Sequence, residues 1–148
     1  MLVDCGEIRL PEREPLPRRL DLLRRRFEAL LAILEPDVAA VESPFHGASA
    51  RSALQLAHAR GVLLACLSAS GIEVVEHTPA SIKKAVTGNG RADKSQVQRM
   101  VVSLLRTKAA GAGADLADAI AAALCELAVG GFREAVERGS RRPQPARR

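Results

Sequence analysis

Aromatic residues are scarce in this chain of 148 residues, which has three Phe and neither Trp nor Tyr. No apolar run approaches the roughly 20 residues needed to cross a bilayer. The opening segment MLVDCGEIR has an acidic residue where a secretory signal carries a basic region, so we expect a cytoplasmic protein. With 47% hydrophobic and 26% charged residues, the composition is typical of a globular chain, and the length suits one domain.

Cysteine and histidine are also few, at three residues each. The widely spaced Cys5, Cys66 and Cys125 form no CxxC pair, which indicates reduced core residues. The histidines show no HExxH spacing, so a zinc site is not expected. A phosphate-cradling GxxxxGK motif and internal repeats are absent as well, which argues against a nucleotide-binding P-loop and a repeat architecture.

Positive charge is in excess, since 22 Lys and Arg against 17 Asp and Glu give a net charge of +5. This balance favours an anionic partner such as nucleic acid. Part of the excess comes from the C-terminal residues 139–148, a Pro- and Arg-rich stretch without an apolar face. We interpret this stretch as a disordered tail, or alternatively as an auxiliary phosphate-binding arm, and residues 1–138 as the folded domain.

A short apolar run, Val38 to Val41, ends in the carboxylate of Glu42 and breaks at Pro44. Its apolar character and its length predict a strand buried on both faces, as in parallel α/β sheets. The carboxyl end of such a strand is where α/β folds bind ligands, so Glu42 is the first catalytic candidate. The alternative is a strand-end Glu that only caps a loop or faces water.

Helical and strand patterns alternate along the rest of the chain and predict an α/β fold with parallel strands. The expected strands besides the Glu42 strand span 2–10 and 72–78. Helices are expected over 16–34, ended by Pro36, and over 50–69. Further helices are expected after the capping residue Thr78 with Pro79, after the capping residue Asp93 with Gln96, and from about Asp115 or Leu116 to Val129. Gly130 and Gly131 are expected to end the last helix, with a weaker helical segment behind them.

Two carboxylates, Asp115 and Asp118, are three residues apart and so lie on one side of the last helix, away from the predicted apolar stripe of Ile120, Leu124 and Leu127. Together with Glu42 they could supply oxygen ligands for Mg²⁺ at the carboxyl end of the sheet. The alternative is purely structural, because Asp at the start of a helix stabilises it without any function.

Basic side chains surround the flexible loop 88–90 and are suited to contacts with a phosphate backbone. They are Lys83, Lys84, Arg91 and Lys94. Phe45, three residues past Glu42, could stack on an unpaired base if its ring is exposed. A solvated loop and a core Phe are the respective alternatives.

Three segments taken in order resemble the RuvC family of Holliday-junction resolvases. They read VESPFHGASARSALQLAHARGV, HTPASIKKAVTGNGRADKSQVQRMV and ADLADAIAAAL. The resemblance implies a ribonuclease H-like fold, two Mg²⁺ ions per active site and nicking of four-way DNA junctions during recombination and repair. It also implies a homodimer formed through the helix 50–69 and a branch-migration complex of the RuvA and RuvB type as a partner.

The resemblance assigns roles to individual positions as well. Glu42, Asp115 and Asp118 match the family's catalytic, metal-binding carboxylates. Lys83 and Lys94 match its DNA-contacting lysines, and Phe45 matches its junction-contacting aromatic residue.

One departure from the family pattern concerns the N-terminus, because family members begin with two further strands, the first carrying a metal-binding Asp in a GIDPG motif. The segment 2–10 resembles the family's third strand instead. We therefore expect a truncated sheet in which 2–10 is either detached from the Glu42 strand or moved across to pair with it. A catalytically impaired junction-binding or dimerisation module is the alternative to an active resolvase, and a ribonuclease H-like RNA-processing nuclease is a third.

Overall fold

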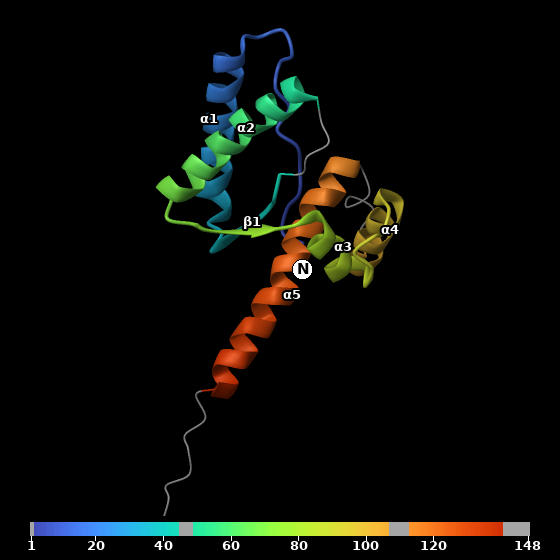
Figure 1. Cartoon of the computed structure of the whole chain (residues 1–148). Coiled ribbons are helices and arrows are strands. Elements are labelled where there is room, and N and C mark those ends of the chain that lie inside the picture. The colour runs from blue at the N-terminus through green and yellow to red at the C-terminus, as the bar shows by residue number, and fades with distance from the viewer. Residues whose placement is uncertain (1, 45–48, 107–112, 141–148) are drawn as a thin grey trace, which may run out of the picture.

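The computed structural model describes residues 2–44, 49–106 and 113–140, and the side chains of these residues up to 131 (Figure 1). The element order confirms the α/β class. It runs α1 (Leu16–Leu34), β1 (Val38–Glu42), α2 (Ala50–Ala69), β2 (Glu73–His77), α3 (Pro79–Thr87), α4 (Lys94–Leu105) and α5 (Ala114–Ser140). None of the described helices is both long and apolar enough to span a membrane.

The two strands form a parallel pair, with α2 as the crossover between them. Their register pairs Val38 with Glu73 at one end and Glu42 with His77 at the other. Parallel strands bring their carboxyl ends to the same edge of a sheet. Glu42 and His77 therefore lie side by side at that edge.

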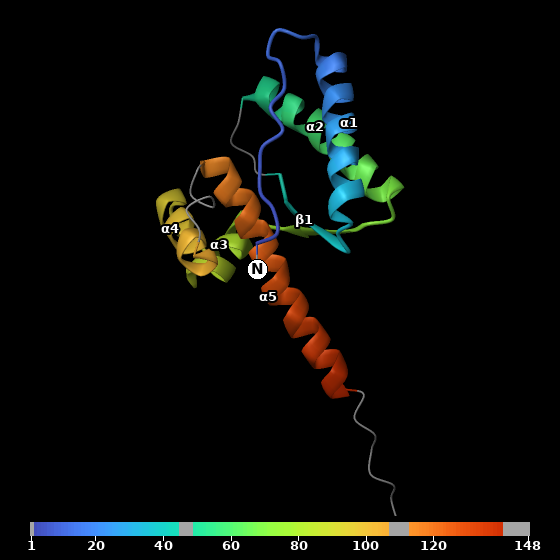
Figure 2. The same ribbon diagram turned by 180° about the vertical axis from the view of Figure 1, so that it is seen from behind.

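The sheet separates two hydrophobic cores, because successive side chains of a strand point to opposite faces. Ala39 packs on the core that α1 and α2 build, and Ala40 packs on the core between α3, α4 and α5. Figures 1 and 2 show α1 and α2 together, away from α3 and α4. The first core is formed by Leu31, Cys66 and Leu67, and the second by Ile82, Val86, Ala92, Val97, Val101, Ile120, Ala121, Ala122 and Cys125.

Local capping signals are confirmed where the sequence predicted them. The hydroxyl of Thr78 accepts a hydrogen bond from the backbone N–H of Ser81 at 3.1 Å and so caps α3. Asp93 and Gln96 form a reciprocal capping box at the start of α4. Gly88 ends α3 with a φ of 77°, a left-handed conformation that favours glycine.

The predicted strand 2–10 is wrong, since the described part of the chain contains no strand there. The segment is instead held by a side chain and by its backbone. Cys5 packs against the core of α3, α4 and α5, and the carbonyl oxygen of Arg9 accepts a hydrogen bond of 2.6 Å from Arg26 of α1. The apolar alternation was loose, and among the described residues the segment pairs with neither strand of the sheet. The segment is thus detached from the Glu42 strand, one of the two expected arrangements.

The prediction that Val38 to Val41 is buried on both faces is also wrong. The strand is exposed at its ends and half-buried at its centre, and Val38 retains 36% of its accessible surface. Both strands are edges of a two-stranded sheet among the described residues, so neither receives the cover that a central strand has.

Helix α5 corrects two further expectations. It does not end at Gly130 and Gly131 but continues to Ser140, so the first two residues of the predicted tail are helical and the rest, 141–148, lies outside the described residues. Leu127, expected in the apolar stripe, is 71% exposed. A Cβ on Gly130 would lie 3.1 Å from Oε1 of Glu126, so glycine here makes room for a neighbouring carboxylate inside a continuing helix.

Candidate functional site

Lys94, the first residue of α4, lies among the three carboxylates that the sequence singled out. Its Nζ is 3.2 Å from Oδ2 of Asp118. This hydrogen bond and the charge of Asp118 raise the pKa of Lys94 above its ordinary value of 10.5, and the charges of Asp115 and Glu42 raise it further. Asp118 thus contacts the ammonium group directly, whereas Asp115 and Glu42 act on it only through their charges.

The path of α5 explains how carboxylates from distant parts of the chain approach each other. This helix packs against both β1 and β2, and against α3 and α4 on its other sides. Its first turns carry Asp115 and Asp118, whereas Glu42 ends β1. The packing brings the start of α5 to the carboxyl edge of the sheet, where α/β folds place their ligands.

The donor chemistry of this site suits a hard cation, because all three candidate ligands are carboxylates. The arrangement of these carboxylates, however, does not match a metal-binding site. Among the described residues, no three His, Cys, Asp or Glu side chains are grouped so that they could hold a metal ion. The Asp118 carboxylate is instead paired with Lys94.

The peptide unit that follows Glu42 is held at both of its polar atoms. The backbone N–H of Ser43 donates to the carbonyl oxygen of His77 at 2.8 Å. The carbonyl oxygen of Glu42 accepts a hydrogen bond of 2.8 Å from Nη1 of Arg60 on α2. Arg60 was not among the site residues predicted from the sequence, although it lies within the first segment that resembles the RuvC family, because an arginine inside a predicted helix gives no signal of its own.

A buried polar pair lies at the same edge of the sheet. Nε2 of His77 is 2.7 Å from Oε2 of Glu126, and both side chains are buried between β2 and α5. The sequence analysis missed this pair, although it contained two signals. His77 ends its strand as Glu42 ends the preceding one, and Glu126 is the lone charged residue in the apolar run 119–129.

The basic positions follow one path over α3, the next loop and the start of α4. Lys83 is half-buried, and Lys84 and Arg91 are exposed. Within the described residues none of these three forms an ion pair with a carboxylate, whereas Lys94 pairs with Asp118. The structure therefore leaves three cations available along the path and a fourth beside the carboxylates. Phe45 lies outside the described residues.

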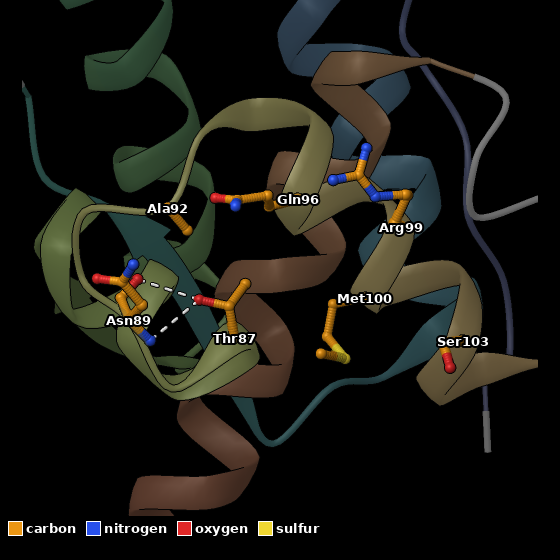
Figure 3. Close-up of a pocket in the computed structure, with 7 residues that line it drawn as sticks. All are labelled: Thr87, Asn89, Ala92, Gln96, Arg99, Met100 and Ser103. Atoms are coloured by element: carbon orange, nitrogen blue, oxygen red, sulfur yellow. Dashed lines mark hydrogen bonds between the residues drawn. The ribbon is translucent and has the colours of Figure 1, made fainter.

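A groove of about 540 Å³ runs along the outer face of α4, next to the loop that carries Arg91 (Figure 3). Arg99 and Gln96 line it from α4, and Asn89 lines it from the loop. The remaining lining residues are Thr87, Ala92, Met100 and Ser103. The groove thus adjoins the loop that carries Arg91 and adds the guanidinium of Arg99 to the polar surface of α4.

Comparison with known proteins identifies the family. The family model described as crossover junction endodeoxyribonuclease RuvC matches residues 1–126. The chain belongs to the RuvC family. The RuvC of Alkaliphilus oremlandii is 37% identical to it over 133 residues, covering 90% of this chain and 81% of that protein. The RuvC of Chloroflexus aggregans is 43% identical over 124 residues, covering 84% and 76%.

Solved RuvC structures share the fold. Thermus thermophilus RuvC matches with a TM-score of 0.77 and 28% identity, covering 85% of this chain and 76% of that one. The same protein in complex with a Holliday junction substrate matches with a TM-score of 0.79. The match confirms the predicted ribonuclease H-like class. RuvC proteins are endodeoxyribonucleases whose reaction depends on metal ions, and nothing in these comparisons supports the alternative of a catalytically impaired module.

Proposed function

We propose that this RuvC protein is a Holliday-junction resolvase, a structure-specific endodeoxyribonuclease that nicks four-way DNA junctions in recombination and repair. The observation that carries the proposal is the contact of 3.2 Å between Lys94 and Asp118, on the helix whose first turn also carries Asp115, with Glu42 at the end of β1, against which that helix packs. Unpaired basic side chains border these carboxylates, and this arrangement is suited to a nucleic-acid strand. The basic side chains can contact the phosphates on either side, while the phosphate at the cleavage position lies at the carboxylates.

In this proposal Glu42, Asp115 and Asp118 are the catalytic carboxylates and the ligands of two Mg²⁺ ions. Bound Mg²⁺ would supply Lewis-acid stabilisation of the leaving oxygen and a nucleophilic water. Asp118 must exchange its contact with Lys94 for a new one when the site assembles. Lys94, already beside the acidic centre, is then free to contact a phosphate of the strand that is cut.

The remaining basic residues contact the junction arms in the proposed complex. Lys83, Lys84 and Arg91 lie on the path that leads from the carboxylates along α3 and the following loop. Cations on such a path bind phosphates without reading sequence. Phe45, close behind Glu42 in the chain, is the proposed stacking residue for an unpaired base at the crossover.

Homodimerisation through α2 is the proposed quaternary arrangement, which would supply one active site for each of two nicks. All residues from 50 to 58 on this helix are exposed in the isolated chain, although Leu54 and Leu56 are among them. Apolar surface of this kind is typical of an interaction site. The cytoplasm is the proposed location, and a branch-migration complex of the RuvA and RuvB type is the proposed partner.

A nicking assay on a labelled synthetic four-way junction tests the function. We expect paired nicks in the presence of Mg²⁺, none with a chelator, and none on a linear duplex built from one of the same strands. A gel-shift assay in chelator reports binding separately. Junction binding without nicking at any Mg²⁺ concentration would refute the resolvase proposal, and preferential cleavage of structured RNA would point to the RNA-processing alternative.

A further inference from the structure

Arg60 reaches from α2 to the carboxyl edge of the sheet and makes two different contacts there. Its Nη1 donates to the carbonyl oxygen of Glu42 at 2.8 Å, and its Nη2 lies 2.7 Å from Oε1 of Glu76 on β2. The Arg60 side chain is only 17% exposed. The guanidinium is therefore largely shielded from solvent, whereas the Glu76 side chain, which is 49% exposed, still meets water.

The contact with the Glu42 carbonyl fixes more than one atom, because a peptide unit is planar. The carbonyl of Glu42 and the N–H of Ser43 belong to the same unit. Arg60 holds the carbonyl, and the backbone of His77 holds the N–H at 2.8 Å. With both polar atoms held, the ψ angle of Glu42 is set, and with it the direction in which its Cα–Cβ bond leaves the strand.

Successive side chains of a strand point to opposite faces, so Glu42, like Ala40, points to the face away from α2, and Arg60 meets only its backbone. The charge of the guanidinium is balanced by Glu76 on the neighbouring strand. The planar fork of arginine can serve a carbonyl and a carboxylate at once, which the single ammonium of a lysine cannot do in the same geometry. The carboxylate of Glu42 therefore remains available at the catalytic edge.

We propose that Arg60 is a positioning residue for Glu42, held in place by Glu76. The inference rests on the proposed function of Glu42 as a catalytic carboxylate. Arg60 itself touches neither substrate nor reacting atoms. Its effect on the reaction comes through the backbone angle of Glu42, so its loss should slow the nicking step without weakening junction binding.

Three variants test this role: Arg60→Met, Arg60→Lys and Glu76→Gln. We expect Arg60→Met to lower the single-turnover nicking rate on a saturating four-way junction by roughly 10- to 100-fold, since small misplacements of a catalytic group have effects of that size. Junction affinity measured in chelator should stay unchanged. Arg60→Lys should recover only part of the rate. Glu76→Gln removes the charge that holds Arg60 but keeps a hydrogen-bond acceptor, so its loss of rate should be smaller than that of Arg60→Met. Arg18→Met, at an exposed arginine of α1, is the matched control and should nick at the wild-type rate.

An NMR measurement tests the positioning without any catalysis. In Arg60→Met the amide of Ser43 should exchange with solvent faster than in the wild type, whereas the amide of Val75 in the adjoining strand should not change. A Ser43 amide that exchanges as in the wild type would overturn the proposal, as would a folded Arg60→Met protein that nicks at the wild-type rate. If the wild type itself fails to nick, the proposed function is refuted and the exchange of Ser43 alone decides the role of Arg60.

Discussion

The imidazole of His77 and the carboxylate of Glu126 meet at 2.7 Å in the interior, and this contact joins the carboxyl end of β2 to α5. His77 is also the register partner of Glu42. Glu126 lies on the helix whose first turns carry Asp115 and Asp118. The buried pair therefore ties α5, which carries two of the proposed catalytic carboxylates, to the strand that pairs with the Glu42 strand.

Removing the Glu126 carboxylate should destabilise the protein. Glu126→Ala leaves the buried imidazole of His77 without this partner, and we expect a loss of about 1 to 3 kcal/mol in the free energy of unfolding. Glu126→Gln should lose less, because an amide can still share a hydrogen bond with the ring. Urea denaturation measures both values. Glu73→Ala is the control, because Glu73 is an exposed residue of β2, the strand that carries His77. A Glu126→Ala protein as stable as this control would contradict the expectation.

Glu42→Gln should abolish nicking and keep junction binding. The substitution removes a negative charge near the phosphates while preserving the size of the side chain, so affinity for the junction should be equal to or higher than that of the wild type. Gel shifts in chelator and nicking assays in Mg²⁺ measure the two properties separately. Equal losses of binding and cleavage would assign Glu42 a structural role instead.

The combination of Lys83→Ala with Lys94→Ala should reduce the salt dependence of junction binding. Each phosphate contact contributes about −0.9 to the slope of log affinity against log salt on duplex DNA, so the slope should flatten by roughly two units. Binding titrations over a range of salt concentrations give this slope. Arg18→Ala, an exposed arginine on α1, is the control and should leave it unchanged. A slope equal to that of the wild type would mean that the two lysines are solvated surface residues that do not contact phosphates.

Charge introduced on α2 should separate the proposed dimer. Leu54→Asp combined with Leu56→Asp places carboxylates on the uncovered half of this helix, which should disfavour burial against a second copy. Sedimentation velocity reports the oligomeric state. Ile33→Asp on α1 is the matched control, since Ile33 is equally an exposed apolar residue but lies outside the proposed interface. Identical sedimentation of the two variants would argue against a dimer through α2.

Stability should fall at alkaline pH through Cys66. Burial raises the pKa of this thiol above its ordinary value of 9.0, and the charge of Glu28 adds to the effect. Because the pKa of Cys66 is raised in the folded state, the protonated thiol contributes fully to stability below the ordinary pKa of 9.0. That contribution is lost as the pH rises through the pKa of the folded state. Urea denaturation between about pH 8 and pH 10 should show a decline that is smaller in Cys66→Val than in Cys5→Ser. Equal declines in the two variants would contradict this cause.

Much of the fold was determined by the sequence through short-range interactions. Pro36, Thr78 and the pair Asp93 with Gln96 act within one helical turn, so the ends of α1, α3 and α4 could be predicted from the order of residues alone. The three family motifs are likewise local patterns. They were sufficient to predict the family and the ribonuclease H-like class, which the comparisons confirmed.

The tertiary structure alone decided which distant groups meet. The packing of α5 across the sheet brings Asp118 to Lys94 and Glu126 to His77, and no spacing along the chain encodes those distances. The same packing accounts for the wrong predictions. The 2–10 segment has strand-like residues, but the structure holds it against the core of α3, α4 and α5 and against α1 instead of at an edge of the sheet. Gly130 looks like a helix stop but lies inside α5, where the lack of a side chain leaves room for the Glu126 carboxylate that bonds to His77.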